Sequence, residues 1–302
     1  MAISRKQFKR DSIKTVIFVI MMIAGLGCLL YPPTADVVNT LNETKVIRIY
    51  KKDIVDLPED LYNGALTQAQ EYNKALAALN FPLVEAAVKL EGYEEALDFS
   101  RNGIMGIIDI PKIDVSLPIY HGTDKAVLGT AVGHLEGTSL PIGGKSTHSV
   151  IAAHRGATNA RLFTDIDQLE IGDEFSVTAL GKTLTYRVDN IITVLPEETE
   201  PLEIIPDKDY VTLQTCTPYG INSHRLLIRG EHVSTKDAKL AESTGDNYIE
   251  TAVTIMKVLT NKRNIVPVII SGVLVVAFVG LRIYMNVKNN HKTNEVKHNN
   301  AD

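Results

Sequence analysis

The sequence contains no tryptophan and only two cysteines, Cys28 and Cys216. A small secreted module held together by disulfides carries more cysteines at framework spacings, which argues against that class of protein. Cys28 lies in an apolar run, where it resembles a small hydrophobic residue. Cys216 is therefore expected to be unpaired. One such cysteine and scattered histidines show none of the paired spacings of a zinc site, so no metal is expected.

A basic excess is also lacking. The 302 residues carry 31 Lys and Arg against 36 Asp and Glu, which gives a formal net charge of −5. Domains that bind nucleic acid usually show a basic face or stripe, so no nucleic acid partner is expected. The length allows one sizeable domain plus appendages.

Two apolar runs lie near the ends of the chain. Val16–Tyr31 has no charge and follows residues 1–15, which hold five basic side chains, the layout of a signal sequence. This run is slightly shorter than the roughly 20 residues that span a bilayer, so cleavage is an alternative to retention. The absence of a small-x-small pattern after Tyr31 favours retention as an anchor. The second run, Ile265–Met285, is long enough to span, and its one charge, Arg282, lies near its end.

The charges that flank the runs predict their orientation. The N-terminal tail is basic, and residues 286–302 contain three lysines, which favours a cytoplasmic position for both termini. Lys262 and Arg263 weigh slightly against this orientation. An alternative is that both runs are buried core helices, but neither shows a polar face. We therefore expect a cell-membrane protein with an extracellular middle.

Residues 36–100 are expected to form a helical lead-in, which is either a packed stalk or a lid. Six residues recur on one helical face at three- and four-residue steps: Leu66, Ala69, Tyr72, Asn73, Leu76 and Leu79. Pro58 separates an earlier helix, and Leu83–Leu97 is expected to form a later one. Residues 236–262 are expected to form a helical linker to the second apolar run.

Residues 103–233 contain short β-rich runs separated by turn residues, with a predicted helix at Arg161–Leu169. This pattern favours a closed barrel or a sandwich. The seven predicted strands are Ile104–Ile110, Leu117–Tyr120, Ser149–Ala153, Phe175–Ala179, Thr183–Val194, Tyr210–Thr215 and Arg225–Gly230.

Cys216 ends the strand-like run YVTLQTC and precedes a turn rich in Pro, Gly and Asn. Strand ends beside loops often carry reactive groups, although a lone cysteine is more commonly a buried apolar residue. A cysteine thiol has a pKa of about 8.5, so a nucleophilic thiol needs a basic partner. Six histidines lie between the apolar runs: His121, His134, His148, His154, His224 and His232.

His154 is the favoured partner because it also ends a strand, whereas His148 begins that strand, about 20 Å away. A cation is needed to hold the carbonyl oxygen as negative charge develops. Arg225 starts the strand after the turn, and Arg229 lies about 13 Å further along. Position therefore favours Arg225, with a surface ion pair as the alternative.

These residues resemble the sortase family. Thr212–Cys216 (TLQTC), followed nine positions later by Arg225, is similar to the TLxTC…R signature. The segments TLQTCTPYGINSHRLLIRG and GHLEGTSLPIGGKSTHSVIAAHRG, and the two anchors, resemble the class C, pilin-polymerising branch. The resemblance covers about residues 103–233.

The resemblance implies a closed eight-stranded sortase β-barrel with a helical lead-in and two terminal transmembrane segments. It implies that Cys216 attacks an LPxTG-like sorting signal, with His154 as acid–base and Arg225 holding the substrate and oxyanion. Thr215 is expected to line the substrate pocket. A lysine amine of a pilin subunit would resolve the acyl-enzyme, with no metal or organic cofactor.

Many class C members carry a lid with an Asp-Pro-aromatic motif, and no such triplet occurs in residues 36–99. Phe81-Pro82 and Asp56-Leu57-Pro58 contain only parts of it. Three rivals remain open at the level of sequence. One is a sortase that attaches surface proteins to cell-wall precursor, and another is a cysteine hydrolase. The third is a non-enzymatic, membrane-tethered adhesin or pilus-assembly scaffold.

Overall fold

The structure, a computed structural model, describes residues 5–79, 90–99, 102–129, 131–157, 160–237 and 248–298. The chain divides into two compact units. One is Asn39–Tyr248, and the other combines Met1–Val38 with Ile249–Asp302. Helix α1 (Arg5–Val55) contributes to both units.

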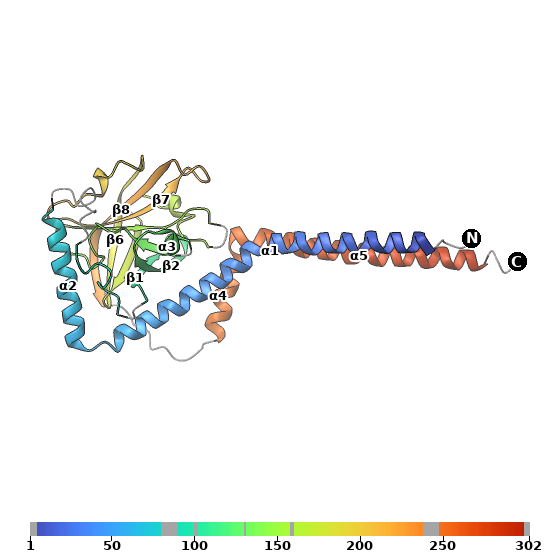
Figure 1. Ribbon diagram of the computed structural model, residues 1–302, viewed down its shortest axis with the longest axis horizontal. Helices are drawn as coiled ribbons and strands as arrows, with labels where there is room; N and C mark the ends of the chain where they lie inside the picture. Colours follow the sequence, from blue (N-terminus) through green and yellow to red (C-terminus); the bar gives the residue numbers. More distant parts are fainter. Residues whose placement is uncertain are drawn as a thin grey trace. The chain divides into compact units, whose positions relative to one another are not determined.

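The larger unit is a closed eight-stranded barrel, as the resemblance implied (Figure 1). Its strands are joined in the order β1-β2-β3-β4-β7-β8-β6-β5. Most neighbours are antiparallel, whereas β2 pairs parallel with β3 and β4 pairs parallel with β7. The strands are β1 (Ile104–Ile110), β2 (Val115–His121), β3 (Val132–His134), β4 (Thr147–Ala152), β5 (Glu174–Ala179), β6 (Lys182–Val194), β7 (Asp209–Thr217) and β8 (His224–Asp237).

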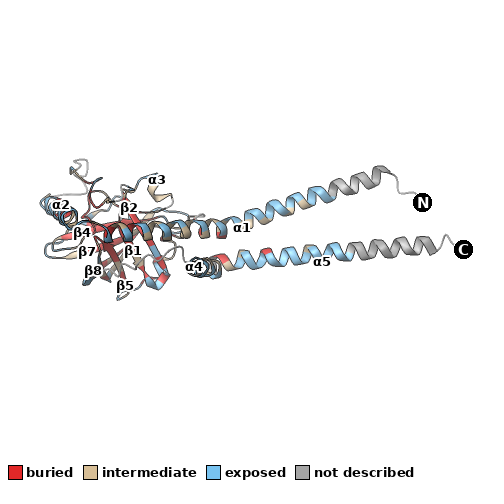
Figure 2. Cartoon of the chain, turned by 90° about the horizontal axis from the view of Figure 1, so that it is seen from below, coloured by how far each residue is buried: buried red, intermediate tan, exposed pale blue. Residues whose placement is uncertain are grey.

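Alternation along the strands builds the core. Every strand sends apolar side chains into one buried cluster inside the barrel, and the loop residues Phe163 and Ile166 join it. Figure 2 shows the strands as the most buried part of the chain. Residues on the opposite face of β4, β7 and β8 are therefore available for a site on the outside of the barrel.

Helices α1 and α2 (Glu59–Ala77) form the lead-in. Pro58 separates them, and α2 buries Ala69, Tyr72, Asn73 and Leu76, the face that the sequence predicts. The end of α1 is fixed to the barrel by Tyr50, whose hydroxyl donates to the Met105 carbonyl at 3.1 Å.

Two predicted helices differ from the structure. Residues 161–169 form turns and a short 3-10 helix at Ile166–Gln168, because Leu162 has φ +41° and packs in the barrel core. Of the predicted helix Leu83–Leu97, residues 83–89 lie outside the described residues, as does Phe81-Pro82. Residues 91–97 form turns rather than a helix.

Strand β8 ends at Asp237, beyond the predicted barrel limit at Val233 and inside the predicted helical linker. The reason is pairing, since β6 and β8 stay in contact as far as Lys182 and Asp237. The linker helix α4 (Tyr248–Thr260) then begins at Tyr248.

The second unit contains the first part of α1, as far as Val38, and the apolar helix near the other end of the chain. Thr15–Val55 and Asn264–Tyr284 contain segments long and apolar enough to cross a membrane. Within this unit, α1 and α5 (Lys262–His298) contact each other through stacked Phe18 and Phe278 rings, 6.1 Å apart. Asn264 also donates to the Asp36 carboxylate at 2.6 Å.

Candidate active site

Three neighbouring strands bring Cys216, His154 and Arg225 into one row. Cys216 and Arg225 are direct partners in the antiparallel pair β7 and β8. On the other side of β7, the parallel pairing with β4 continues past the end of that strand. The Ala153 amide donates there to the Gln214 carbonyl at 3.1 Å. His154 therefore lies beside Cys216, with about 5 Å between their strands.

The three side chains leave the same face of the barrel. Ala153, Leu213 and Leu226 belong to the interior cluster. Side chains alternate along a strand, so the residues an odd number of positions away point outwards. Cys216, His154 and Arg225 are such residues. The row therefore lies on the outer face, at the end of the barrel where β4 and β7 finish.

Exposure matches the chemistry expected of each group. Cys216 is a free, partly exposed thiol, and His154 is exposed. Arg225 is half-buried, and its guanidinium donates to the carbonyls of Asn222 and His224 at 3.4 and 3.2 Å. These bonds hold the guanidinium at the turn that follows Cys216. An exposed imidazole and a held cation thus lie on the two sides of the thiol.

The other histidines are placed differently. Burial lowers the pKa of both His134 and His148 to about 4, so both are neutral at neutral pH. His148 is hydrogen-bonded to Thr212 at 2.7 Å and lies near the start of β4, six residues before His154. His121 is buried as well, with Nε2 at 2.7 Å from the Ala96 carbonyl. Of the six histidines, all of them described, His154 has the position of a partner for Cys216.

Arg229 is also accounted for. Its guanidinium forms an ion pair with Asp189 at 2.6 Å and lies 4.3 Å from the centroid of the Tyr210 ring. The surface ion pair considered for Arg225 is therefore found at Arg229 instead.

The structure corrects the prediction that Thr215 lines the substrate pocket. Its side chain is on the inner face and only 2 % of the residue is exposed. The hydroxyl donates to the Ala153 carbonyl at 2.8 Å. Because strand residues alternate, Thr215 must face inwards when its neighbour Cys216 faces outwards. Thr215 therefore connects the backbones that carry Cys216 and His154.

One contact beside the site was not predicted from the sequence. Gly156, two residues after His154, has φ +80°, and a Cβ atom there would lie 2.7 Å from the Tyr219 ring. The Arg155 guanidinium lies 5.9 Å from the centroid of the same ring. Tyr219 follows Cys216 in the turn, so the loops after β4 and β7 pack on each other. In the sequence, Gly156 directly after His154-Arg155 was the one feature that could have indicated a close approach of another loop at this point.

Comparison with known proteins places the chain in a family. A sortase domain model matches residues 108–233. Sortase C1 of Streptococcus agalactiae is 45% identical, with a TM-score of 0.58, over 63% of this chain and 98% of that one. Streptococcus pneumoniae sortase C is 38% identical, with a TM-score of 0.57, over 63% of this chain and 97% of that one. Its structure was reported to give insights into pilin substrate specificity.

Clostridium perfringens sortase C, solved with the C-terminal cell wall sorting motif, is 42% identical with a TM-score of 0.54. That similarity covers 63% of this chain and 99% of that one. The matched region contains the whole row of Cys216, His154 and Arg225. The chain belongs to the sortase family of cysteine transpeptidases, in its class C branch.

Proposed function

We propose that this chain is a membrane-anchored pilin polymerase with Cys216 as its nucleophile. The observation that carries the proposal is the row of His154, Cys216 and Arg225 on three adjacent strands. Class membership supports the same reaction, because sortases are cysteine transpeptidases. The roles of the three residues are part of the proposal.

In the first half-reaction, the Cys216 thiolate attacks the carbonyl carbon of the threonine in an LPxTG-like sorting signal. Arg225 holds the oxygen while it carries negative charge. The threonine–glycine bond breaks, a thioester forms on Sγ, and the leaving glycine amine takes a proton from the His154 imidazolium.

In the second half-reaction, the ε-amine of a pilin lysine attacks the thioester carbonyl. His154 takes a proton from the amine, the carbon–sulfur bond breaks, and Cys216 leaves as the thiolate. The product is an isopeptide bond between two pilins. Neither half-reaction requires a cofactor.

The structural neighbours support the choice of substrates. The Clostridium perfringens enzyme was solved with a cell wall sorting motif, and the Streptococcus pneumoniae structure concerns pilin specificity. Identities of 42% and 38% extend along nearly all of those chains. We therefore assign the same classes of donor and acceptor to this chain.

The two apolar helices support membrane anchoring at both ends. In the most apolar 18-residue segment of the first helix no residue is buried, and in that of the second helix 11% of the residues are buried. Low burial disfavours the alternative of core helices. With both basic tails in the cytoplasm, the barrel lies on the extracellular side.

The lead-in remains a candidate lid or stalk. The Asp56–Pro58 segment is the turn between α1 and α2, and Phe81-Pro82 lies outside the described residues. The proposed reaction does not depend on which of the two roles the lead-in has.

The two cysteines provide a matched test. The full chain in detergent is given a sorting-signal peptide and a lysine-bearing pilin domain, and the joined product is measured. Cys216→Ala is expected to abolish the product, whereas Cys28→Ala keeps wild-type turnover. Normal turnover by Cys216→Ala contradicts the proposal. Hydrolysis alone, or transfer only to a wall-precursor amine, favours the corresponding rival.

A further inference from the structure

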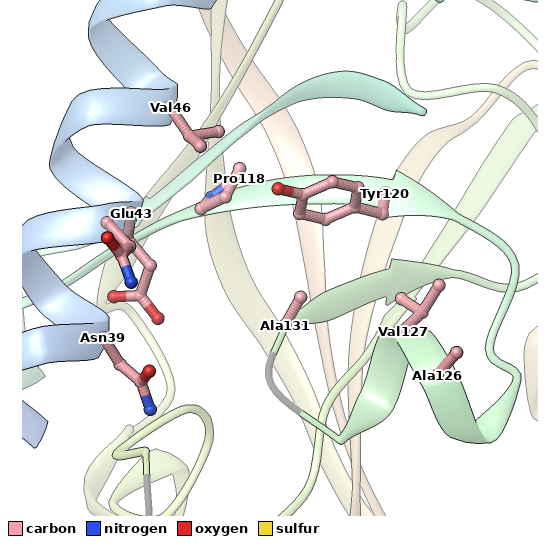
Figure 3. A pocket seen from close by; sticks show the side chains of 9 residues that line it. Asn39, Glu43, Val46, Pro118, Tyr120, Ala126, Val127 and Ala131 are labelled. Carbon is pink, nitrogen blue, oxygen red and sulfur yellow. The ribbon is translucent and has the colours of Figure 1, made fainter. Parts of the chain in front are cut away.

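A groove of about 470 Å³ lies between α1 and strand β2, with the loop before β3 beside it (Figure 3). All of its lining residues belong to the unit Asn39–Tyr248. The mechanism proposed above does not use this groove. The kind of ligand that fits the groove follows from three features: its position relative to the active-site row, the chemistry of its lining residues and its distance from the Cys216 thiol.

The helix wall of the groove is held in place. Tyr50 of α1 is buried, donates to the Met105 carbonyl and accepts from the Leu180 amide at 3.3 Å. Ile54 packs with it against Ile104 and Ile107 in a buried cluster. Because the helix is fixed at Tyr50, about one turn from the groove residue Val46, the groove is formed before any ligand arrives.

Strand register connects the groove to the active site. β2 and β3 pair Ile119 with Val132, which aligns Pro118 with Ala131. The antiparallel pair of β3 and β4 matches Gly133 with Ala152, and two residues further it aligns Ala131 with His154. The row of the active site therefore continues on the outer face from His154 into the floor of the groove.

This arrangement determines the direction of access. Arg225 lies on one side of Cys216, and His154 lies on the other. A group that enters from the groove meets His154 before it reaches the thioester carbon. The second half-reaction requires the same order, because the incoming amine must lose a proton as it attacks.

The walls have mixed chemistry. α1 contributes the Glu43 carboxylate with the Asn39 and Asn42 amides, and Figure 3 shows the Glu43 and Asn39 side chains directed into the groove. Val46 of α1 and Pro118 of β2 add apolar surface, and β2 also contributes the Tyr120 ring. Burial raises the pKa of Tyr120 and the Glu43 charge raises it further, so the hydroxyl remains protonated beside the carboxylate.

Distance limits what occupies the groove. β2 is separated from β7 by two strands, so Pro118 lies about 14 Å from Cys216 along the row. A lysine side chain bound at Glu43 does not reach the thioester from there. An extended chain covers about 3.3 Å per residue, so a residue three or four positions from the reacting lysine does reach the groove.

We propose that the groove between α1 and β2 binds the segment of the acceptor pilin that carries the reacting lysine. A cationic or donor-rich side chain three or four residues from that lysine contacts Glu43, and an apolar neighbour packs on Val46 and Pro118. This assignment rests on the proposed function and adds the acceptor subsite to it.

The test separates the two half-reactions in the full chain in detergent. Glu43→Lys is compared with Glu71→Lys, a matched change at an exposed position on α2. Thioester formation from the sorting-signal peptide is followed by intact mass. Transfer is then measured to the pilin domain and to hydroxylamine, which is too small to use the groove.

With Glu43→Lys, we expect the half-saturating concentration of pilin domain to rise at least about tenfold, because a charged contact becomes a repulsion. Thioester formation and transfer to hydroxylamine serve as internal references, and Glu71→Lys stays within about twofold of wild type. If the half-saturating concentration of pilin domain is the same for Glu43→Lys as for the wild type, the groove assignment is overturned. Slower thioester formation in Glu43→Lys also overturns it, because the groove then serves the donor peptide. Absence of a thioester in the wild-type chain overturns the proposed function itself.

Discussion

At the scale of single residues, Thr215 connects, from inside the barrel, the strand ends that carry Cys216 and His154. The Thr215 hydroxyl donates to the Ala153 carbonyl. Thr215 directly precedes Cys216, and Ala153 directly precedes His154. Thr215→Val keeps the volume and removes the donor, so the two strand ends lose a bond that fixes their separation. We expect thioester formation to slow about tenfold, since small displacements of reacting groups are costly.

Thr215→Ser is the control for that prediction, because it restores the hydroxyl without the methyl group. The rate of thioester formation by intact mass distinguishes the variants. A Thr215→Val chain as fast as wild type would show that the hydrogen bond has no part in positioning.

Arg225 gives a second prediction at this scale. Arg225 donates through Nη1 to the carbonyls of Asn222 and His224, which leaves the other nitrogens of its planar fork for the proposed substrate oxygen, whereas a lysine supplies only a point charge. Arg225→Lys is expected to lower the rate of thioester formation about a hundredfold, the usual cost of an oxyanion donor.

Arg187→Lys is the matched control for Arg225→Lys, because Arg187 forms a surface ion pair with Glu174. Such a pair contributes little, so this variant is expected to keep its activity. Equal rates for both lysine variants would remove Arg225 from the proposed mechanism.

Position in the sequence was sufficient to find the row of Cys216, His154 and Arg225, but not to place Thr215. Cys216, His154 and Arg225 each stand where a strand-like run meets a turn, and the structure brings them together. Thr215 was misassigned although the alternation of the strand already excluded a shared face with Cys216. The groove at Glu43 depends on α1 packing against β2, a long-range contact that no local pattern encodes.

At the scale of elements, replacing glycine by alanine is expected to have opposite effects on stability at two positions, Gly230 and Gly64. In β8, a Cβ on Gly230 would lie 2.7 Å from the Phe175 ring and 2.9 Å from the Tyr186 Cβ. Gly230→Ala is therefore expected to destabilise the barrel by about 1–3 kcal/mol, the usual cost of overpacking.

Gly64 lies on helix α2, where a Cβ atom would meet nothing within 4 Å apart from the local helix backbone, and alanine favours a helix by about 1 kcal/mol over glycine. Gly64→Ala is expected to raise the thermal unfolding midpoint, and Gly230→Ala to lower it. A lowered midpoint for Gly64→Ala, or an unchanged one for Gly230→Ala, would contradict this account of the packing.

Long periodic elements were predicted well, and short or context-dependent ones were not. Strand β1 was predicted with its observed limits, whereas β3 has only three residues and no recognisable alternation. The apolar residues of 161–169 resembled a helix, but burial of Phe163 and Ile166 in the barrel determines their conformation. Tertiary packing overrides local propensity in such segments.

At the scale of the whole molecule, two buried histidines predict a dependence of stability on pH. Both have a pKa lowered to about 4 by burial, whereas histidines of the unfolded chain have a pKa of about 6.5. Between these values the unfolded state binds more protons, so the folded state loses stability as pH falls from about 6.5 to 4. The loss is on the order of 3 kcal/mol for each histidine.

The thermal midpoint is expected to fall between pH 7.5 and 5, and to fall less in a His134→Gln chain. His134 contacts Tyr93 and the Ser139 carbonyl, which glutamine can also hydrogen-bond. The variant separates the contribution of His134 from that of carboxylates such as Asp209, whose pKa is raised by burial. A midpoint that is constant or rises towards pH 5 would contradict the prediction.

The most direct test of the central claim is intact mass spectrometry of the full chain with a sorting-signal peptide, before and after addition of a lysine-bearing pilin domain. We predict a mass increase equal to the acyl group on Cys216. The added domain should then remove this increase as an isopeptide-linked product appears. A wild-type chain that gains no mass, or a Cys216→Ala chain that gains the same mass, would contradict the account.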